Sequence, residues 1–243
     1  EEIDLRIFQN HWKFAFGVVE GNRKSLQFFA KNGSALHKIY LTEDSNEALF
    51  DTIIEKFKAE DQNQILEFEN IAQKPEEKAD AEIDVEGFQK AWLELKDTHD
   101  FFMMTRKFGV SRTQALRLAP EGFAKKIDSS KVINILEDAS EKKLPIMIFV
   151  GNIGIIQIHT GEVKKTMWHQ QWFNVMDPDF NLHLDVTKIA ETWIVKKPTE
   201  DGEVTAIEVF NKEGDFIVQF FGKRKPGIHE LQEWKDLVAS LED

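Results

Sequence analysis

The sequence predicts an α+β protein of two tandem repeats, each a large antiparallel sheet with flanking helices, with the first repeat incomplete. Three observations support this prediction. Helical patterns precede a run of strands in the second half of the chain, which is the order typical of α+β proteins. Most strands alternate and are joined by short glycine-containing turns, which favours antiparallel hairpins. A strand–turn–strand–helix pattern also occurs twice.

The repeat is clearest in two hairpins. Residues 25–41 resemble residues 206–222, and the turns Lys-Asn-Gly and Lys-Glu-Gly align Gly33 with Gly214. Glycine at this place supplies the positive φ that a tight hairpin needs. We therefore expect the same hairpin in both repeats.

Segments on either side of the hairpins extend the repeat. Upstream, residues 3–7 align with residues 180–184, and downstream both copies continue into an amphipathic helix, predicted over 45–57 and 229–241. The second copy has a long segment before residue 180, whereas the first copy begins almost at once. We therefore expect the front half of the first repeat to be missing from this chain.

These alignments predict three parts of the chain. Residues 1–60 are expected to form the C-terminal half of the first repeat. Residues 61–84 are polar and acidic and contain Pro75, which is typical of a linker. Residues 85–243 are expected to form a complete second repeat, and we expect this repeat to carry the principal ligand-binding residue.

The second repeat begins with helices and ends with strands. A helix is predicted over 85–107 with Gly109 as its stop, and Ser111 with Gln114 forms a capping-box pattern for a helix that ends near Leu118. Further elements follow from the pattern of apolar residues: helices over 120–126 and 129–141, then strands over 145–152, 154–161, 165–176, 180–184, 188–197, 205–211 and 216–222.

Composition excludes several classes of protein. The net charge of −12 opposes nucleic-acid binding, and the absence of cysteine excludes disulfides and thiolate metal sites. No apolar stretch is long enough to span a membrane, and the first residues do not resemble a signal peptide. The 20 Phe and 6 Trp against one Tyr suit an apolar core or a pocket for a flat apolar ligand.

Motifs of the common enzymes are absent. There is no His-Glu-x-x-His zinc motif, no Gly-x-Ser-x-Gly nucleophile elbow, no Walker loop and no dinucleotide-binding glycine pattern. Residues 108–119 could form a helix-turn-helix that carries Arg112 and Arg117, so a DNA-binding regulator remains a remote alternative. The net charge disfavours it.

His99 is the candidate of most interest among the histidines. It falls on one face of the helix predicted over 85–107, with Phe88, Trp92, Leu95, Phe102 and Arg106. One interpretation is a buried core histidine that is bonded to a carbonyl. The other is an axial ligand of heme iron, because neutral imidazole suits iron and an apolar face suits a porphyrin. The residues alone favour the first interpretation.

Several segments of the sequence resemble a known family, the HemS/ChuS/PhuS group of cytoplasmic hemin-degrading or heme-trafficking proteins of Gram-negative heme-uptake systems. The segments that carry the resemblance are LKDTHDFF (95–102), KFGVSR (107–112), GNIGIIQIHTGEVK (151–164), QWFNVMDPDFNLHL (171–184), ETWIVKKPTEDG (191–202), QFFGKRKPG (219–227), IDLRIFQNHWKFAF (3–16) and RKSLQFFAKNGSALHKIYL (23–41). They cover nearly all of 85–243 and the C-terminal half of the first repeat.

The resemblance implies that heme lies in a cleft between the helices and the sheet of the second repeat. His99 would then be the proximal ligand of the iron, and Arg6 in the segment IDLR would lie on the distal side. Arg112, Lys197 and Arg224 would contact the two propionates.

The function that the resemblance implies is that of a cytoplasmic heme-binding protein of a bacterial iron-acquisition system. It would handle imported heme for trafficking and iron release, with an inner-membrane heme importer and a heme-accepting or heme-degrading protein as partners. A heme-degrading enzyme that opens the ring with O₂ and an external electron donor, as heme oxygenase does, is the alternative. The sequence does not decide between them.

Overall fold

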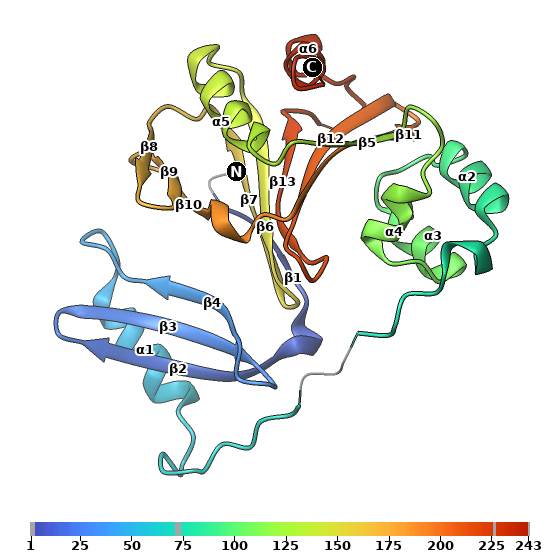
Figure 1. Ribbon diagram of the computed structural model, residues 1–243. Coiled ribbons are helices and arrows are strands. Elements are labelled where there is room, and N and C mark those ends of the chain that lie inside the picture. Colours follow the sequence, from blue (N-terminus) through green and yellow to red (C-terminus); the bar gives the residue numbers. More distant parts are fainter. Residues whose placement is uncertain (1–2, 71–73, 226, 243) are drawn as a thin grey trace. The chain divides into compact units, whose positions relative to one another are not determined.

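The computed structural model describes residues 3–70, 74–225 and 227–242. It divides into two compact units, shown in Figure 1. The large unit contains residues 75–151 and 157–243 and the N-terminal residues up to Asp4, and the small unit contains residues 5–74 and 152–156. The division of the chain at residues 60 and 84 stays a prediction.

The large unit is built on an antiparallel sheet with strand order β7-β6-β13-β12-β11-β5, and β8, β9 and β10 form a separate antiparallel sheet of three strands. The first of these sheets also includes β1, of which only Asp4 belongs to the large unit. The strands are β1 (Asp4–Ile7), β5 (Ala124–Ile127), β6 (Ile146–Gly151), β7 (Ile155–Gly161), β8 (Thr166–His169), β9 (Trp172–Met176), β10 (Asn181–Asp185), β11 (Glu191–Thr199), β12 (Gly202–Phe210) and β13 (Phe216–Gly222).

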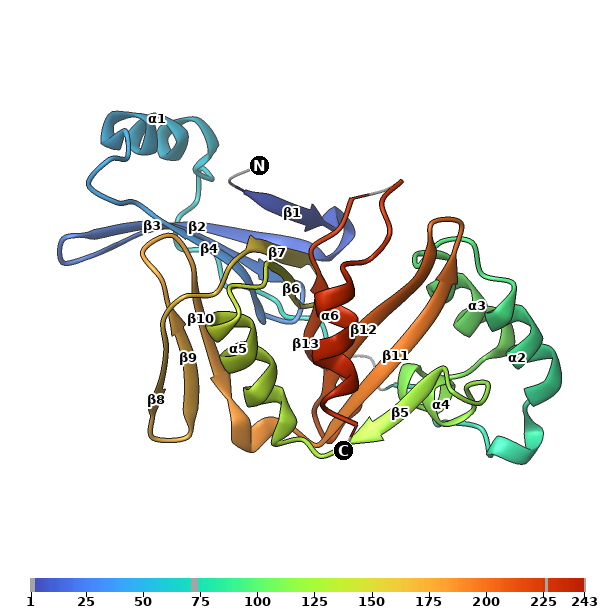
Figure 2. The same ribbon diagram turned by 90° about the horizontal axis from the view of Figure 1, so that it is seen from above.

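Helices cover both faces of this sheet, as Figure 2 shows. The helices α5 (Lys131–Glu141) and α6 (Gln232–Ala239) bury their apolar residues in one core, together with Phe220 of β13 and Phe173 of β9. The helices α2 (Val85–Leu93), α3 (Asp100–Phe108) and α4 (Arg112–Arg117) form a second core against β11 and the end of β12. Among the described helices, none is long and apolar enough to span a membrane.

The predicted repeat is confirmed by the order of elements. In the first copy β1 is followed by a 3-10 helix (Gln9–His11), β2, β3, β4 and α1, and in the second copy β10 is followed by a 3-10 helix (Val186–Lys188), β11, β12, β13 and α6. Gly33 and Gly214 have φ values of 81° and 72°, so both hairpin turns use glycine as expected. The α+β fold class is therefore confirmed.

Two helix predictions are wrong. The helix expected over 85–107 is interrupted, and α2 and α3 are separated by six residues without helix. The helix expected over 120–126 is absent, because the chain there forms β5, in which Ala124 pairs with Val195 and Ile127 with Thr192 of β11. Pairing along the open edge of β11 outweighs the weak local helix preference of so short a segment.

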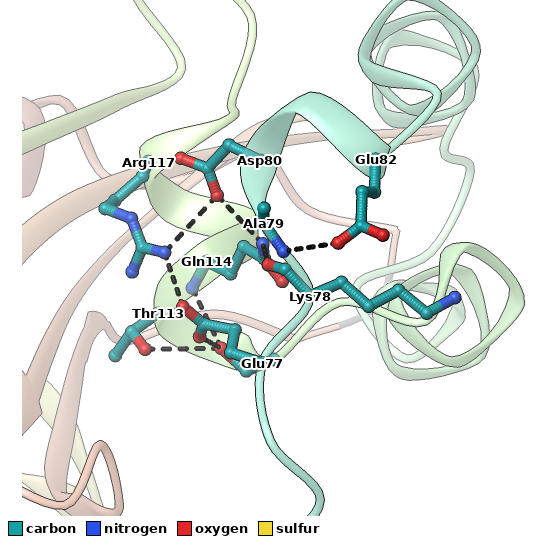
Figure 3. Close-up of polar contacts among 9 residues, drawn as sticks. Glu77, Lys78, Ala79, Asp80, Glu82, Thr113, Gln114 and Arg117 are labelled. Atoms are coloured by element: carbon teal, nitrogen blue, oxygen red, sulfur yellow. Dashed lines mark hydrogen bonds and ion pairs between the residues drawn. The ribbon is translucent and has the colours of Figure 1, made fainter.

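The end of the predicted linker is bound to α4 (Figure 3). The Gln114 side chain donates to Lys78 O and to Asp80 Oδ1, both at 2.8 Å, and Arg117 pairs with Glu77 at 2.5 Å. Ser111 Oγ accepts from the backbone N–H of Gln114 at 3.0 Å, as the capping pattern predicts. The reciprocal half of the capping box does not form. The Gln114 Nε2 atom is directed at the linker, and its Oε1 has no hydrogen-bond partner among the described residues.

The small unit is a three-stranded antiparallel sheet of β2 (Trp12–Glu20), β3 (Arg23–Ala30) and β4 (Ala35–Tyr40), with α1 (Glu47–Phe57) packed against β2. Gly17 permits this packing, because a Cβ there would lie 2.0 Å from Ile54 Cδ1. The turn 152–156 belongs to this unit, since Trp12 Nε1 donates to Gly154 O at 2.8 Å.

Candidate functional site

His99 lies where the predicted helix breaks. The Asp97 carboxylate accepts the backbone N–H of His99 at 2.7 Å, which closes a local side-chain turn, and α3 starts one residue later. Such turns compete with helix formation because they satisfy a backbone donor locally. His99 therefore sits just before the first residue of α3 rather than in mid-helix, and its side chain is 92% exposed. The buried-core interpretation of His99 is thus wrong.

The His99 ring has a defined tautomer. Its Nδ1 lies 2.6 Å from Asp97 Oδ1, and an ionised carboxylate can only accept a hydrogen bond. The Nδ1 atom must therefore carry a hydrogen, which in the neutral ring leaves the lone pair on Nε2. An imidazole held by a carboxylate in this way is the usual arrangement of a metal-ligating histidine.

Hydrogen bonding also keeps Asp97 ionised. The backbone N–H and the ring N–H of His99 lower the pKa of Asp97, and the positive charge of Arg224 lowers it further. The partner of the ring is therefore an anion over the working range of pH. An anionic acceptor raises the basicity of the imidazole and so strengthens its bond to a metal.

Apolar surface surrounds the start of α3. Phe102 and Met103 are 61% and 62% exposed, and residues of α2, α3 and the break between them line an open hollow of about 460 Å³. It is lined by Ala91, Glu94, Leu95, Lys96, Asp100, Met103, Met104 and Lys107. Exposed side chains of this size next to an exposed imidazole are typical of a binding surface.

Two of the predicted propionate contacts belong to one buried cluster. The Arg112 Nε donates to Glu208 Oε2 at 2.9 Å and the Lys197 Nζ donates to Glu208 Oε1 at 2.9 Å. The Glu208 side chain is fully buried, whereas the side chains of Lys197 and Arg112 are 5% and 21% exposed. Both cations also lie over the Phe101 ring, with Arg112 Cζ 4.2 Å and Lys197 Nζ 4.7 Å from its centre.

Charge in this cluster is unbalanced. Burial would raise the pKa of Glu208, but the charges of Arg112 and Lys197 outweigh it and lower that pKa to about 2. Burial and the neighbouring Arg112 lower the pKa of Lys197 to about 8. At neutral pH the cluster thus holds two cations and one anion. The excess positive charge suits a carboxylate of a ligand, which would share Arg112 with Glu208.

Arg224 lies near the Asp97 side of the site. Its guanidinium is 3.7 Å from Asp201 Oδ2 in the turn between β11 and β12, and its charge acts on Asp97. The same turn is joined to the break between α2 and α3, because Glu200 N donates to Lys96 O at 3.0 Å. The large unit thus gathers four of the predicted residues, with Arg112 and Lys197 in one cluster and His99 and Arg224 in another.

Arg6 lies in the small unit. It is exposed on β1, where its guanidinium donates to Leu5 O at 3.3 Å. Its predicted role on the distal side of a ligand stays a prediction. Lys196, the sequence neighbour of Lys197, is partly exposed, and its carbonyl accepts from Trp92 Nε1 at 3.0 Å.

Sequence reasoning missed three residues of the site. Asp97 orients His99, Glu208 holds Arg112 and Lys197, and Phe101 supports both cations. A signal for Glu208 was present, since a carboxylate within a run of buried strand residues needs a partner. Its partners could not be inferred because they lie on other elements.

Comparison with known proteins identifies the family. A family model described as the haemin-degrading HemS.ChuX domain matches residues 1–57 and 109–241, which is more than half of the chain. The chain belongs to the HemS/ChuX family. It is 38% identical to the hemin transport protein HemS of Yersinia enterocolitica, over 98% of this chain and 70% of that protein.

Solved structures agree with this assignment. Apo-PhuS of Pseudomonas aeruginosa, described as a heme-binding protein, matches with a TM-score of 0.96 and 43% identity over 98% of this chain and 70% of that chain. ChuS of Escherichia coli O157:H7, described as a heme degrading enzyme, matches with a TM-score of 0.91 and 36% identity over the same shares. ChuX, at 18% identity, shares the fold of one part.

Proposed function

We propose that this chain binds heme through Nε2 of His99 and handles imported heme in the cytoplasm. The observation that carries the proposal is the exposed imidazole whose Nδ1–H is held by Asp97. A structure of PhuS in its holo form, described as a heme-binding protein, matches this chain with a TM-score of 0.94. Heme is the cargo here, and the apolar residues around α3 suit its ring.

The cations of the site serve the two propionates. Arg112 lies nearest to solvent in its cluster, and Arg224 lies on the Asp97 side, so each suits one carboxylate. Lys197 is nearly buried and bound to Glu208, so it contributes mainly by holding Glu208, the partner of Arg112, and by adding positive charge. The side chains of Arg112 and Arg224 are 21% and 18% exposed, so a propionate paired with them would stay in partial contact with solvent and would be oriented more than held.

Arg6 would act on the distal side. A guanidinium can donate a hydrogen bond to a ligand of the iron but cannot itself coordinate a metal, because it has no free lone pair. We expect Arg6→Ala to change the distal ligand of the complex and to lower affinity less than His99→Ala does. An equal loss of affinity would contradict this role.

The partners of a carrier would be an inner-membrane heme importer and a protein that accepts or degrades heme. An exposed His99 supports this proposal, because a ligand near the surface can be exchanged with a partner. Together, this chain and its two partners would supply a bacterium with iron from heme.

Hemin titration followed at the Soret band tests the ligand. His99→Ala should weaken binding and shift the band, whereas His11→Ala, which removes an exposed histidine of the small unit, should do neither. An unchanged spectrum and affinity in His99→Ala, with the fold intact by circular dichroism, would refute the assignment.

Heme degradation is the second candidate function. A solved ChuS structure described as an E. coli heme oxygenase is 35% identical to this chain, with a TM-score of 0.87. Single-turnover spectroscopy of the heme complex with a reductant, and with catalase to remove peroxide, separates the two candidates. Loss of the Soret band with release of CO would show an enzyme. An intact complex that transfers its heme to an acceptor protein would show a carrier.

A further inference from the structure

The outer face of the three-stranded sheet β10-β9-β8 holds a second hollow. Its volume is about 470 Å³, and its lining is Met167, His169, Trp172, Asn174, Met176 and His183. The strand register explains this set. Asn174 of β9 lies opposite both Met167 of β8 and His183 of β10, so these side chains cross the sheet in one row. The opposite face packs Phe173 and Val175 into the core.

Asn174 fixes the tautomer of His183. The Asn174 Nδ2 donates to Trp172 O at 3.1 Å and to Met167 O at 3.3 Å, so its Oδ1 must be the atom that faces the imidazole. His183 Nδ1 lies 2.6 Å from that oxygen. An amide oxygen accepts only, and therefore Nδ1 carries the hydrogen and Nε2 has the lone pair. Asn174 is 5% exposed, which holds this arrangement in place.

The lining restricts the ligand to few classes. Among the described residues that line the hollow there is no lysine, arginine, aspartate or glutamate. A phosphate or a carboxylate placed inside the hollow would lose its hydration without a counter-charge, so the charged groups of a ligand would have to stay in solvent at the open side of the hollow. A sugar would need several donors and acceptors, but the Asn174 amide is already used. The imidazole nitrogens and the indole N–H of Trp172 are the polar side-chain atoms that remain, and the indole N–H can only donate. An imidazole lone pair suits a metal.

The size of the hollow favours a larger ligand over a bare metal ion. A bare ion needs several donors within about 2.0–2.3 Å, whereas a hollow of about 470 Å³ falls in the range of sites for organic ligands. Trp172 provides a flat apolar surface, and the thioethers of Met167 and Met176 are polarizable and adaptable. These features together suit a metal that is coordinated by a wide, flat and apolar organic ring.

We propose that this hollow binds a planar metal–tetrapyrrole through Nε2 of His183, at a site separate from that of His99. The site is made entirely by β8, β9 and β10 of the large unit. The chain would therefore take up a second equivalent of hemin. This proposal does not depend on the proposed role of His99.

The test uses the full chain in which His99 is replaced. Hemin titrated into His99→Ala should still bind one equivalent with the spectrum of a histidine-ligated iron. The double variant His99→Ala/His183→Gln should lose that spectrum and bind at least tenfold more weakly. Glutamine keeps an N–H donor for Asn174 Oδ1, so the sheet should remain folded, as circular dichroism will show.

Two controls make the result specific. His99→Ala/His169→Ala removes the other imidazole of the hollow and should keep the spectrum, which distinguishes His183 from any nearby histidine. Iron-free protoporphyrin IX and Zn²⁺ alone should each bind much more weakly than hemin. Retention of the histidine-ligated spectrum in the His183→Gln double variant would overturn the proposal. So would equal binding of the iron-free ring, or tight binding of Zn²⁺ alone.

The outcomes also separate this proposal from the function proposed above. If His99→Ala loses nothing while His183→Gln loses binding, the assignment of His99 fails and this one stands. If His183→Gln changes nothing while His99→Ala abolishes all binding, the reverse holds. Wild-type chain that binds a single equivalent, lost with His99, contradicts the second site.

Discussion

His99 and His183 both donate a ring N–H and leave Nε2 available, but the acceptors and their surroundings differ. His99 is held by a carboxylate and has Arg112, Lys197 and Arg224 in the same unit. His183 is held by a buried amide in a hollow without charged lining among the described residues. The first arrangement favours a strongly bound, anionic ligand that can be exchanged at an exposed surface. The second favours a ligand that is held mostly by apolar contact.

The largest expected effect tests the charged region. Glu208→Gln leaves Arg112 and Lys197 buried without their anion, so the free energy of unfolding should fall by about 3–5 kcal/mol. Urea denaturation measures it. Glu203→Gln is the matched control, because Glu203 is exposed on the same strand, and it should change stability by less than about 0.5 kcal/mol. Equal effects would show that the buried cluster has no special role.

Acid should act on the same cluster. The pKa of Glu208 is about 2 in the folded chain, below its ordinary value of 4.5. The unfolded chain therefore binds the proton first, and the free energy of unfolding should fall as the pH drops from 4.5 towards 2. Glu208→Gln should lack this part of the acid dependence. If wild type and variant lose stability in parallel, the ion cluster does not set the acid limit.

At high pH, Lys197 should make the free energy of unfolding rise rather than fall. Its pKa is about 8 in the folded chain and 10.5 ordinarily, so between these values the unfolded chain binds more protons. The free energy of unfolding should therefore rise as the pH increases from 8 to 10.5. Lys197→Met should remove this rise. A fall over the same interval in wild type would contradict the lowered pKa.

A substitution at Asp97 can give His99 the same kind of hydrogen-bond acceptor that His183 has. Asp97→Asn keeps an acceptor for His99 Nδ1 but removes its charge, as at His183. Hemin affinity should fall by about tenfold, and by up to about 100-fold in Asp97→Ala, since partners of metal-ligating histidines carry effects of this size. The Soret titration measures both. Asn174→Asp is the reverse exchange and should strengthen binding in the hollow rather than at His99.

Arg224 should have the smallest effect. Arg224→Gln removes one propionate partner near the surface, which should cost about 0.2–1 kcal/mol of binding free energy. The loss should shrink at high ionic strength because salt screens such pairs. Titration at two salt concentrations measures it. Lys223→Gln, next to it in sequence and exposed, should show no loss.

Local signals in the sequence predicted much of the fold. The hairpin glycines Gly33 and Gly214, the cap at Ser111 and the stop at Gly109, whose φ is 67°, are confirmed. Each depends on residues close in sequence. The break at 94–99 was missed, although Asp97 followed by His99 and Asp100 resembles the start of a helix. The apolar spacing across this break continued the period of α2 and concealed it.

The candidate site was only partly accessible from the sequence. The resemblance named His99, Arg112, Lys197 and Arg224, but it did not show that Glu208 already holds two of them. It also did not show that His183 would face a hollow, because strand alternation alone does not tell whether an outward face is flat or concave. Contacts between distant elements decide both points.

One measurement tests most directly whether His99 ligates the iron with Asp97 behind it. It is the iron–histidine stretching band in the resonance Raman spectrum of the ferrous heme complex, measured in a His183→Gln background so that the second proposed ligand does not contribute. A hydrogen bond from Nδ1 to a carboxylate strengthens the iron–nitrogen bond, so the band should move to lower frequency in Asp97→Asn and disappear in His99→Ala. A band that keeps its frequency in Asp97→Asn and survives in His99→Ala would contradict the account.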